Sequence, residues 1–185
     1  MVHGRPLSHL HSDIPVTDSA SRFTTGPAWL HRVVADLPEL TDWAWSLEHR
    51  ARESLVMRVL RGRHMQTIST LCDEMGAALQ FPYYFGGNFN AIEDCLTDLD
   101  WLPGDSYVLV MTDAPSVLAR ADPDDLQAFL ALLARVHEYW QHGGDGPDSD
   151  PVPFDVILHA TEATAPRLQE RLTGAHVVAS ELRIP

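Results

Sequence analysis

FPYYFGGNFNAIEDCLTDLDW, residues 81–101, joins an aromatic loop with two glycines directly to a short stretch of helical periodicity. Pro82 fixes the backbone where the loop begins, and Gly86 and Gly87 allow conformations that residues with a Cβ atom avoid. Asn88 occupies the position of a helix N-cap, where its side chain can accept a hydrogen bond from a backbone N–H group. The stretch therefore predicts a fixed loop followed by a helix.

The expected helix has one apolar face and one polar face. The apolar positions recur at helical spacing and predict the buried stripe: Phe89, Ile92, Cys95 or Leu96, and Leu99. The opposite face carries hydrogen-bond acceptors and negative charge: Asn90, Glu93, Asp94, Thr97 and Asp98. An ordinary solvated face is one interpretation of this pattern, and a docking surface for a cationic partner is the other.

The charge of the surrounding sequence favours the docking surface. No Lys or Arg occurs between His64 and Ala119, and most of the net charge of −13 lies there. The acids of this segment are Asp73, Glu74, Glu93, Asp94, Asp98, Asp100, Asp105 and Asp113. A negative electrostatic field speeds association with a positively charged partner, and it repels the phosphate backbones of nucleic acids. We therefore expect a cationic partner and no nucleic-acid binding.

Strand and helix patterns alternate from residue 55 onward. Apolar runs predict strands at residues 55–60, 107–111 and 154–158. Helices are expected to open at Ser69 or Thr70, and at Pro123 after Asp122 as N-cap, the latter ending at Gly143. This alternation predicts an α/β fold, with a small parallel sheet of about three strands and helices packed on it.

Two further parts flank this core. Residues 1–27 lack periodicity and an apolar signal region, so we expect a flexible arm and a cytoplasmic protein. Residues 28–52 carry apolar side chains at helical spacing, which predicts a helical extension. The α/β domain then spans residues 53–185 and ends with a helix opening at Thr164 and an edge strand within residues 175–182. No apolar run reaches the roughly 18 residues of a membrane span.

The loop and helix resemble the barstar family, whose members inhibit small secreted ribonucleases such as barnase. The positions that carry the resemblance are Pro82, Tyr84, Phe85, Gly86, Asn88, Asn90, Ala91, Asp94, Cys95 and Leu96. Outside them, over roughly residues 55–159, the resemblance lies in the order of the elements. It implies a barstar-like three-layer arrangement of the predicted sheet and helices.

The resemblance also implies a function, that of an immunity protein or antitoxin. The acidic helix and the preceding loop would occlude the active site of a basic ribonuclease, since carboxylates match the planar fork of Arg. Asp94 matches the carboxylate inserted into that active site, Tyr84 the loop aromatic that packs on the nuclease, and Glu138 an acid of a later helix. The other expected contact residues are Gly86, Asn88, Asn90, Glu93, Thr97 and Asp98. A core-capping Tyr84 and a solvated Glu138 are the structural alternatives.

Three positions depart from the family pattern. Asn90 stands where relatives commonly carry Asp, Glu93 stands where the type member has Trp, and Gly87 replaces a longer residue. One charge is lost and one is gained within a turn of Asp94. We therefore hypothesise that the inhibited nuclease differs from that of the type member. The alternative is an interaction or regulatory module that binds a protein other than a nuclease.

An enzyme is the least favoured interpretation. A hydrolase using His137, Glu138 and His142 is conceivable, but the two His residues are five apart and diverge around a helix, so we expect no metal site. No phosphate-binding or nucleophile motif occurs in the sequence, so we expect no cofactor and no catalysis. Cys72 and Cys95 fall on core faces and are expected to be reduced, with a disulfide as the alternative.

Overall fold

The computed structural model describes residues 28–51, 55–144 and 150–185. Its strands are β1 (Leu30–Val34), β2 (Leu55–Arg61), β3 (Ser106–Thr112), β4 (Phe154–Ala160) and β5 (Ser180–Glu181). Its helices are α2 (Leu37–Ala51), α3 (Ile68–Leu79), α4 (Phe89–Asp98), α5 (Pro123–Gln141) and α6 (Ala165–Gly174), with short 3-10 turns η2 (Gly62–His64) and η3 (Ala114–Ser116). The predicted arm, residues 1–27, lies outside the described residues.

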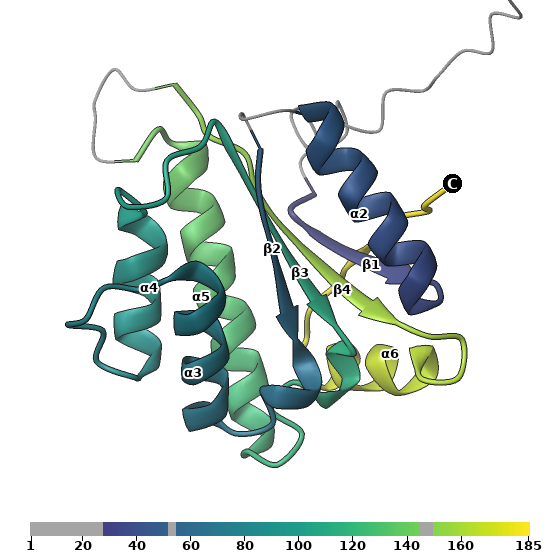
Figure 1. Ribbon diagram of the computed structural model, residues 1–185. Helices are drawn as coiled ribbons and strands as arrows, with labels where there is room; N and C mark the ends of the chain where they lie inside the picture. The colour runs from purple at the N-terminus through teal and green to yellow at the C-terminus, as the bar shows by residue number, and fades with distance from the viewer. Residues whose placement is uncertain (1–27, 52–54, 145–149) are drawn as a thin grey trace, which may run out of the picture.

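The strands form one parallel sheet in the order β2-β3-β4-β1-β5 (Figure 1). The expected α/β fold with a parallel sheet is therefore confirmed, and β2, β3 and β4 are the three strands that the apolar runs predict. Two more strands extend the sheet: β1 pairs with β4, and β5 pairs with the other side of β1. The expected C-terminal edge strand is present as the short β5.

The expected helical extension over residues 28–52 is wrong in its first part. Leu30–Val34 is strand β1, and the helix covers Leu37–Ala51 only. Apolar residues at positions 30, 33 and 34 suit helical spacing as well as a short buried strand, so periodicity alone does not separate the two. The long-range pairing with β4 favours a strand over a helix here, because it buries Val33 fully in the core.

Helices cover both faces of the sheet, which gives the expected three layers (Figure 1). On one face, side chains of α3, α4, α5 and α6 share one core with the alternate residues of β3, Tyr107, Leu109 and Met111. On the other face, α2 packs on the alternate set, which includes Val108 and Val110. The alternation follows from the two-residue period of a strand.

The helix starts follow from local hydrogen bonds. Thr67, not Ser69 or Thr70, is the N-cap of α3, and its hydroxyl accepts from the Thr70 backbone N–H. The sequence places this start two or three residues late, because the capping box of α3 uses a threonine, Thr70, at the position where a Glu or Gln is the usual signal. Asp122 is the N-cap of α5, as expected. Over the described ranges, no helix is both long and apolar enough to cross a membrane.

Candidate functional site: an acidic protein-docking surface

The loop between α3 and α4 turns two aromatic side chains inward and two outward. Phe81 and Phe85 are partly buried, and their ring centroids lie 4.8 Å apart in an edge-on contact. Tyr83 is fully exposed and Tyr84 is 62% exposed. The Phe85 backbone N–H donates to the Pro82 carbonyl at 2.9 Å, which closes the loop. The loop thus holds two tyrosines toward solvent, and Tyr84 does not cap the core.

One of the two loop glycines requires its special conformation. Gly87 has a φ of 64°, whereas Gly86 does not adopt a positive φ. A Cβ atom at Gly86 would lie 3.4 Å from the Asn88 side-chain nitrogen and 3.5 Å from the Ala91 Cβ, which are ordinary van der Waals distances. The expectation that both glycines adopt conformations avoided by other residues is therefore corrected for Gly86.

Asn88 caps α4 as the sequence predicts. Its side-chain oxygen accepts from the Ala91 backbone N–H at 3.0 Å, and its side-chain nitrogen donates to the Gly86 carbonyl at 3.3 Å. The first bond satisfies a backbone donor that the helix itself leaves unpaired. The second ties the loop to the helix, so the position of the tyrosines is coupled to the start of α4.

Helix α4 has the two faces that its sequence predicts. Ile92, Cys95 and Leu96 are buried, and Leu99, just beyond the helix, is buried as well. Asn90, Asp94 and Asp98 are exposed along the opposite side. We call the exposed side chains of the loop and helix together the docking face: Tyr83, Tyr84, Asn90, Asp94 and Asp98.

Glu93 behaves differently from the other acids of α4. Its carboxylate accepts two hydrogen bonds from Arg135 of α5, one of them from Nε at 2.8 Å. Hydrogen bonding to this guanidinium lowers the pKa of Glu93, and only 29% of the Glu93 side chain is exposed. Arg135 is itself about half exposed. Its guanidinium therefore adds a positive group beside the docking face, a contribution that the sequence reasoning missed.

Thr97 turns its hydroxyl back onto the helix. The hydroxyl donates toward the Glu93 carbonyl at 3.0 Å and the Asp94 carbonyl at 3.1 Å. Such bonds satisfy a polar side chain locally and leave fewer of its hydrogen bonds for a partner. Of the predicted contact residues in α4, Asn90, Asp94 and Asp98 are thus the more available, while Glu93 and Thr97 make internal bonds.

Glu138 lies on the helix next to α4. Three contacts show that α4 and α5 run parallel: the Phe89 and Phe129 rings stack, Glu93 pairs with Arg135, and the Trp140 indole donates to the Leu96 carbonyl. A residue between 135 and 140 therefore lies level with Asp94 and Cys95. Glu138 is exposed and three residues beyond Arg135, which places it on the same side of α5. We therefore expect the Glu138 carboxylate near the docking face.

The charged residues of the docking face, Asp94 and Asp98, are both acidic, and the Arg135 guanidinium lies beside this face in its pair with Glu93. Within the described ranges, neither Asp94 nor Asp98 forms an ion pair or accepts a side-chain hydrogen bond. Partial removal from water and the negative charge of Asp98 raise the pKa of the Tyr84 hydroxyl. Tyr84 therefore stays a neutral hydrogen-bond donor next to free carboxylates.

Both cysteines are buried, and His137 and His142 bond to backbone carbonyl groups. Cys72 and Cys95 are buried and are not joined by a disulfide, and burial raises the pKa of both thiols. The His137 ring bonds to the Phe154 carbonyl, while the His142 ring bonds to the Glu138 carbonyl. In the described part of the chain, no group of three or more His, Cys, Asp or Glu side chains is arranged to hold a metal ion.

Comparison with protein families gives one match. The family model of barstar, described as the barnase inhibitor, matches residues 55–159. These residues begin at β2 and end in β4, and they include the complete docking face. No curated protein matches the chain.

Several solved structures share the fold. The ORC2 protein of Aeropyrum pernix in its ADP form aligns with a TM-score of 0.60 at 13% identity, over 90% of this chain and 46% of that chain. The same protein in ADPNP–ADP complexes aligns with a TM-score of 0.59 at 12% identity, over 90% and 45%. Drosophila ORC bound to DNA aligns with a TM-score of 0.53 at 9% identity, over 90% and 28%. The chain thus spans less than half the length of these proteins, and the likeness concerns the fold alone.

Proposed function

The chain belongs to the barstar family, and on this premise we propose that it inhibits a cationic ribonuclease by covering the active site of that enzyme. The docking face would carry the contact, with Asp94 at its centre and Glu138 at its border. The protein itself would perform no chemistry and need no cofactor. It would act as an immunity protein or antitoxin does, by forming a complex.

One observation carries this proposal: Asp94 is exposed on a well-capped helix and has no internal cation partner among the described residues. A carboxylate held in this way can accept two hydrogen bonds from an Arg fork on a partner. The helix and loop are fixed before binding, so the partner does not have to order them. The exposed Tyr83 and Tyr84 supply apolar contact area beside the charges, as interface tyrosines commonly do.

The charge distribution supports a basic protein as partner and disfavours nucleic acid. The face presents Asp94 and Asp98, with Glu138 nearby, in a chain of net charge −13. Active sites of ribonucleases must attract the phosphates of RNA, so they carry positive charge, and carboxylates at suitable positions can replace those phosphates. Association should therefore be fast at low salt and slower as salt screens the field.

The test is capture of the partner followed by an activity measurement. Immobilised protein is incubated with cell extract and culture medium of its source organism, then washed and eluted with high salt. We expect the eluate to cleave a fluorogenic RNA, and the activity to be suppressed again when the protein is added back at low salt. Beads that carry Asp94→Ala should capture much less of this activity.

Two controls make the result specific. Asp42→Asn alters an exposed acid of α2 on the opposite face of the sheet, and this variant should capture the ribonuclease as well as the wild type does. Capture of proteins that release no ribonuclease activity, unaffected by salt and by Asp94→Ala, would overturn the proposal.

The pairing of Glu93 with Arg135 favours the second candidate, an interaction module for a protein other than a nuclease. This pair removes one negative charge from the acidic helix and places a guanidinium at its side. A partner of mixed charge would match such a surface better than a uniformly basic active site. The capture experiment separates the two, because a module would retain a partner that has no ribonuclease activity.

A further inference from the structure

A second polar surface lies at the carboxyl end of β2, away from the docking face. A cavity of about 480 Å³ opens between η2, the start of α3 and the segment that follows η3. This volume lies in the range of small-molecule sites. Helix α3 separates it from the aromatic loop, and its 12 residues correspond to about 18 Å along the axis. A ligand of this cavity would therefore not compete with a partner on the docking face.

Two arginines of the cavity have no internal partner. Among the described residues, neither the Arg63 nor the Arg120 side chain forms an ion pair or hydrogen bond. By contrast, Arg32, Arg61 and Arg135 pair with Glu181, Glu74 and Glu93. In a chain of net charge −13, two unpaired guanidinium groups on one cavity form a local positive region.

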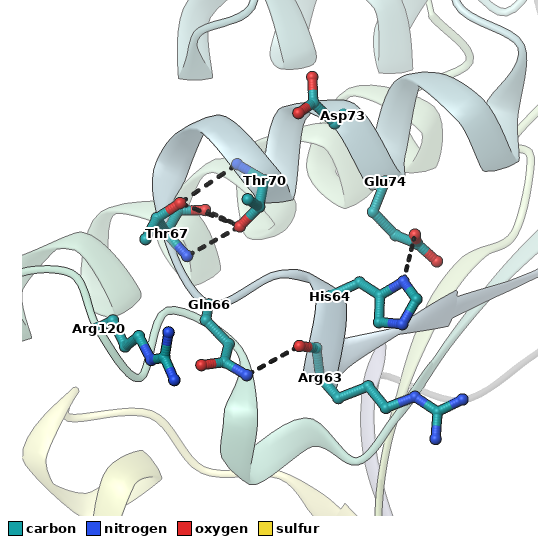
Figure 2. A pocket seen from close by; sticks show the side chains of 8 residues that line it. All are labelled: Arg63, His64, Gln66, Thr67, Thr70, Asp73, Glu74 and Arg120. Carbon is teal, nitrogen blue, oxygen red and sulfur yellow. Dashed lines mark hydrogen bonds and ion pairs between the residues drawn. The ribbon is translucent and has the colours of Figure 1, made fainter.

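Neither of the two acids that line the cavity, Asp73 and Glu74, pairs with Arg63 or Arg120. The Glu74 carboxylate is 7% exposed and accepts from the Arg61 Nε at 2.8 Å and Nη2 at 2.9 Å, so its charge is already balanced. His64 lies near the same carboxylate, with its Nδ1 3.8 Å from Glu74 Oε2. Figure 2 shows the Asp73 side chain pointing away from the row formed by Arg120, Gln66 and Arg63.

The backbone holds both arginines in place. The Arg120 N–H donates to the Gln66 carbonyl at 2.9 Å, and the Leu118 N–H donates to the Met65 carbonyl at 2.7 Å. The Gln66 side chain donates to the Arg63 carbonyl at 2.9 Å. These bonds join the two segments that carry the arginines, so the backbone positions of Arg63 and Arg120 are fixed relative to each other, while their exposed side chains are free to turn toward a ligand.

We propose that this cavity binds a small phosphorylated ligand with at least two anionic groups, held between Arg63 and Arg120. Figure 2 shows the two guanidinium groups on opposite sides of Gln66, with the Arg63 side chain extending away from Arg120, so a ligand that contacts both must be longer than a single phosphate or must draw the Arg63 side chain toward it. Each planar guanidinium can donate two parallel hydrogen bonds to phosphate oxygens. The Gln66 side-chain oxygen lies between them and can accept from a hydroxyl or amide of the ligand.

Inorganic pyrophosphate is the minimal probe. Pyrophosphate is titrated into the whole chain, and binding is measured by calorimetry and by the shifts of amide NMR signals. We expect saturable binding with a Kd of about 1 mM or tighter. The shifted amides should cluster at residues 63–70 and 118–121. Acetate, used as a monovalent control, should not compete with pyrophosphate.

Exposed arginines allow matched variants that keep the fold. Arg63→Gln and Arg120→Gln should each weaken pyrophosphate binding at least about fivefold, because each removes one charged fork. Arg167→Gln alters an exposed arginine of α6 that does not line this cavity. The affinity of this variant for pyrophosphate should stay within about twofold of the wild-type affinity. Thermal unfolding of each variant checks that the structure is retained.

The proposal is overturned if pyrophosphate does not saturate the protein by about 10 mM, or if Arg167→Gln weakens binding as much as the cavity variants do. It is also overturned if the amide shifts spread over the whole surface. The site does not depend on ribonuclease inhibition: Arg63→Gln should capture the ribonuclease normally, and Asp94→Ala should bind pyrophosphate normally.

Discussion

At the scale of single residues, Glu93 shows what the sequence can predict and what it cannot. Helical spacing predicts that Ile92 and Cys95 are buried and that Asp94 is exposed, and all three predictions are confirmed. The same spacing places Glu93 on the solvated face, but the structure gives it a guanidinium partner from α5. Arg135 is 42 residues away in the sequence, so no local pattern indicates the contact. It depends on how two helices pack, which is a tertiary property.

The Glu93 and Arg135 pair should contribute modestly to stability. Glu93→Gln should lower the free energy of unfolding by about 0.5 kcal/mol at neutral pH, a small value because Arg135 is half exposed and screened by water. Because the guanidinium lowers the folded-state pKa of Glu93, the wild type has this stabilisation above the ordinary Glu pKa of about 4.3 and loses it as the pH falls through the folded pKa.

Urea unfolding at neutral and at acidic pH checks this prediction. The difference between wild type and Glu93→Gln should be present at neutral pH and vanish in acid. Arg135→Met should give a loss of similar size, and the double variant should be little worse than either single variant. A difference that is unchanged in acid, or strictly additive losses, would contradict the pairing.

At the scale of elements, the loop and α4 follow closely from the sequence, whereas β1 does not. The start of α4 depends on Asn88 and the turn at Gly87, which are local features and are predicted correctly. Strand β1 depends on a place between β4 and β5, which no neighbouring residue in the sequence determines. Gly86 shows a further limit, because a glycine in a loop does not reveal whether its φ is positive.

The two loop glycines provide a matched pair of substitutions. Gly87→Ala should lower the free energy of unfolding by about 1 kcal/mol, because alanine is strained at a φ of 64°. Gly86→Ala should be close to neutral, since its Cβ would meet neighbours at ordinary distances. Chemical unfolding of both variants tests this, and equal effects would show that the backbone of the loop differs from the one described here.

At the scale of the whole molecule, the barstar-like segment is part of a larger sheet. The family match begins at residue 55, yet β1 hydrogen-bonds to β4, and α2 covers the second face of the sheet. Buried side chains of that face include Met57, Val108, Val110 and Ile157. The parallel α/β class could be predicted from the alternation of strands and helices. The sequence does not predict that residues 28–51 contribute to the same core.

A truncation tests this dependence. The fragment 55–185 should fail to unfold cooperatively or should aggregate, because it exposes one edge of β4 and the apolar face under α2. The fragment 28–185 retains β1 and α2 and should unfold cooperatively like the whole chain. Circular dichroism and size-exclusion chromatography distinguish the two. A monomeric 55–185 fragment with the melting temperature of the whole chain would contradict this account.

The most direct measurement is the affinity of the captured ribonuclease for the wild type and for Asp94→Ala, by titration calorimetry at two salt concentrations. Because the substitution leaves a buried cation of the partner unpaired, we predict a loss of at least about 2 kcal/mol, or about thirtyfold. Higher salt should weaken the wild-type complex as well. A loss below about 0.5 kcal/mol would remove Asp94 from the centre of the interface and contradict inhibition by this face.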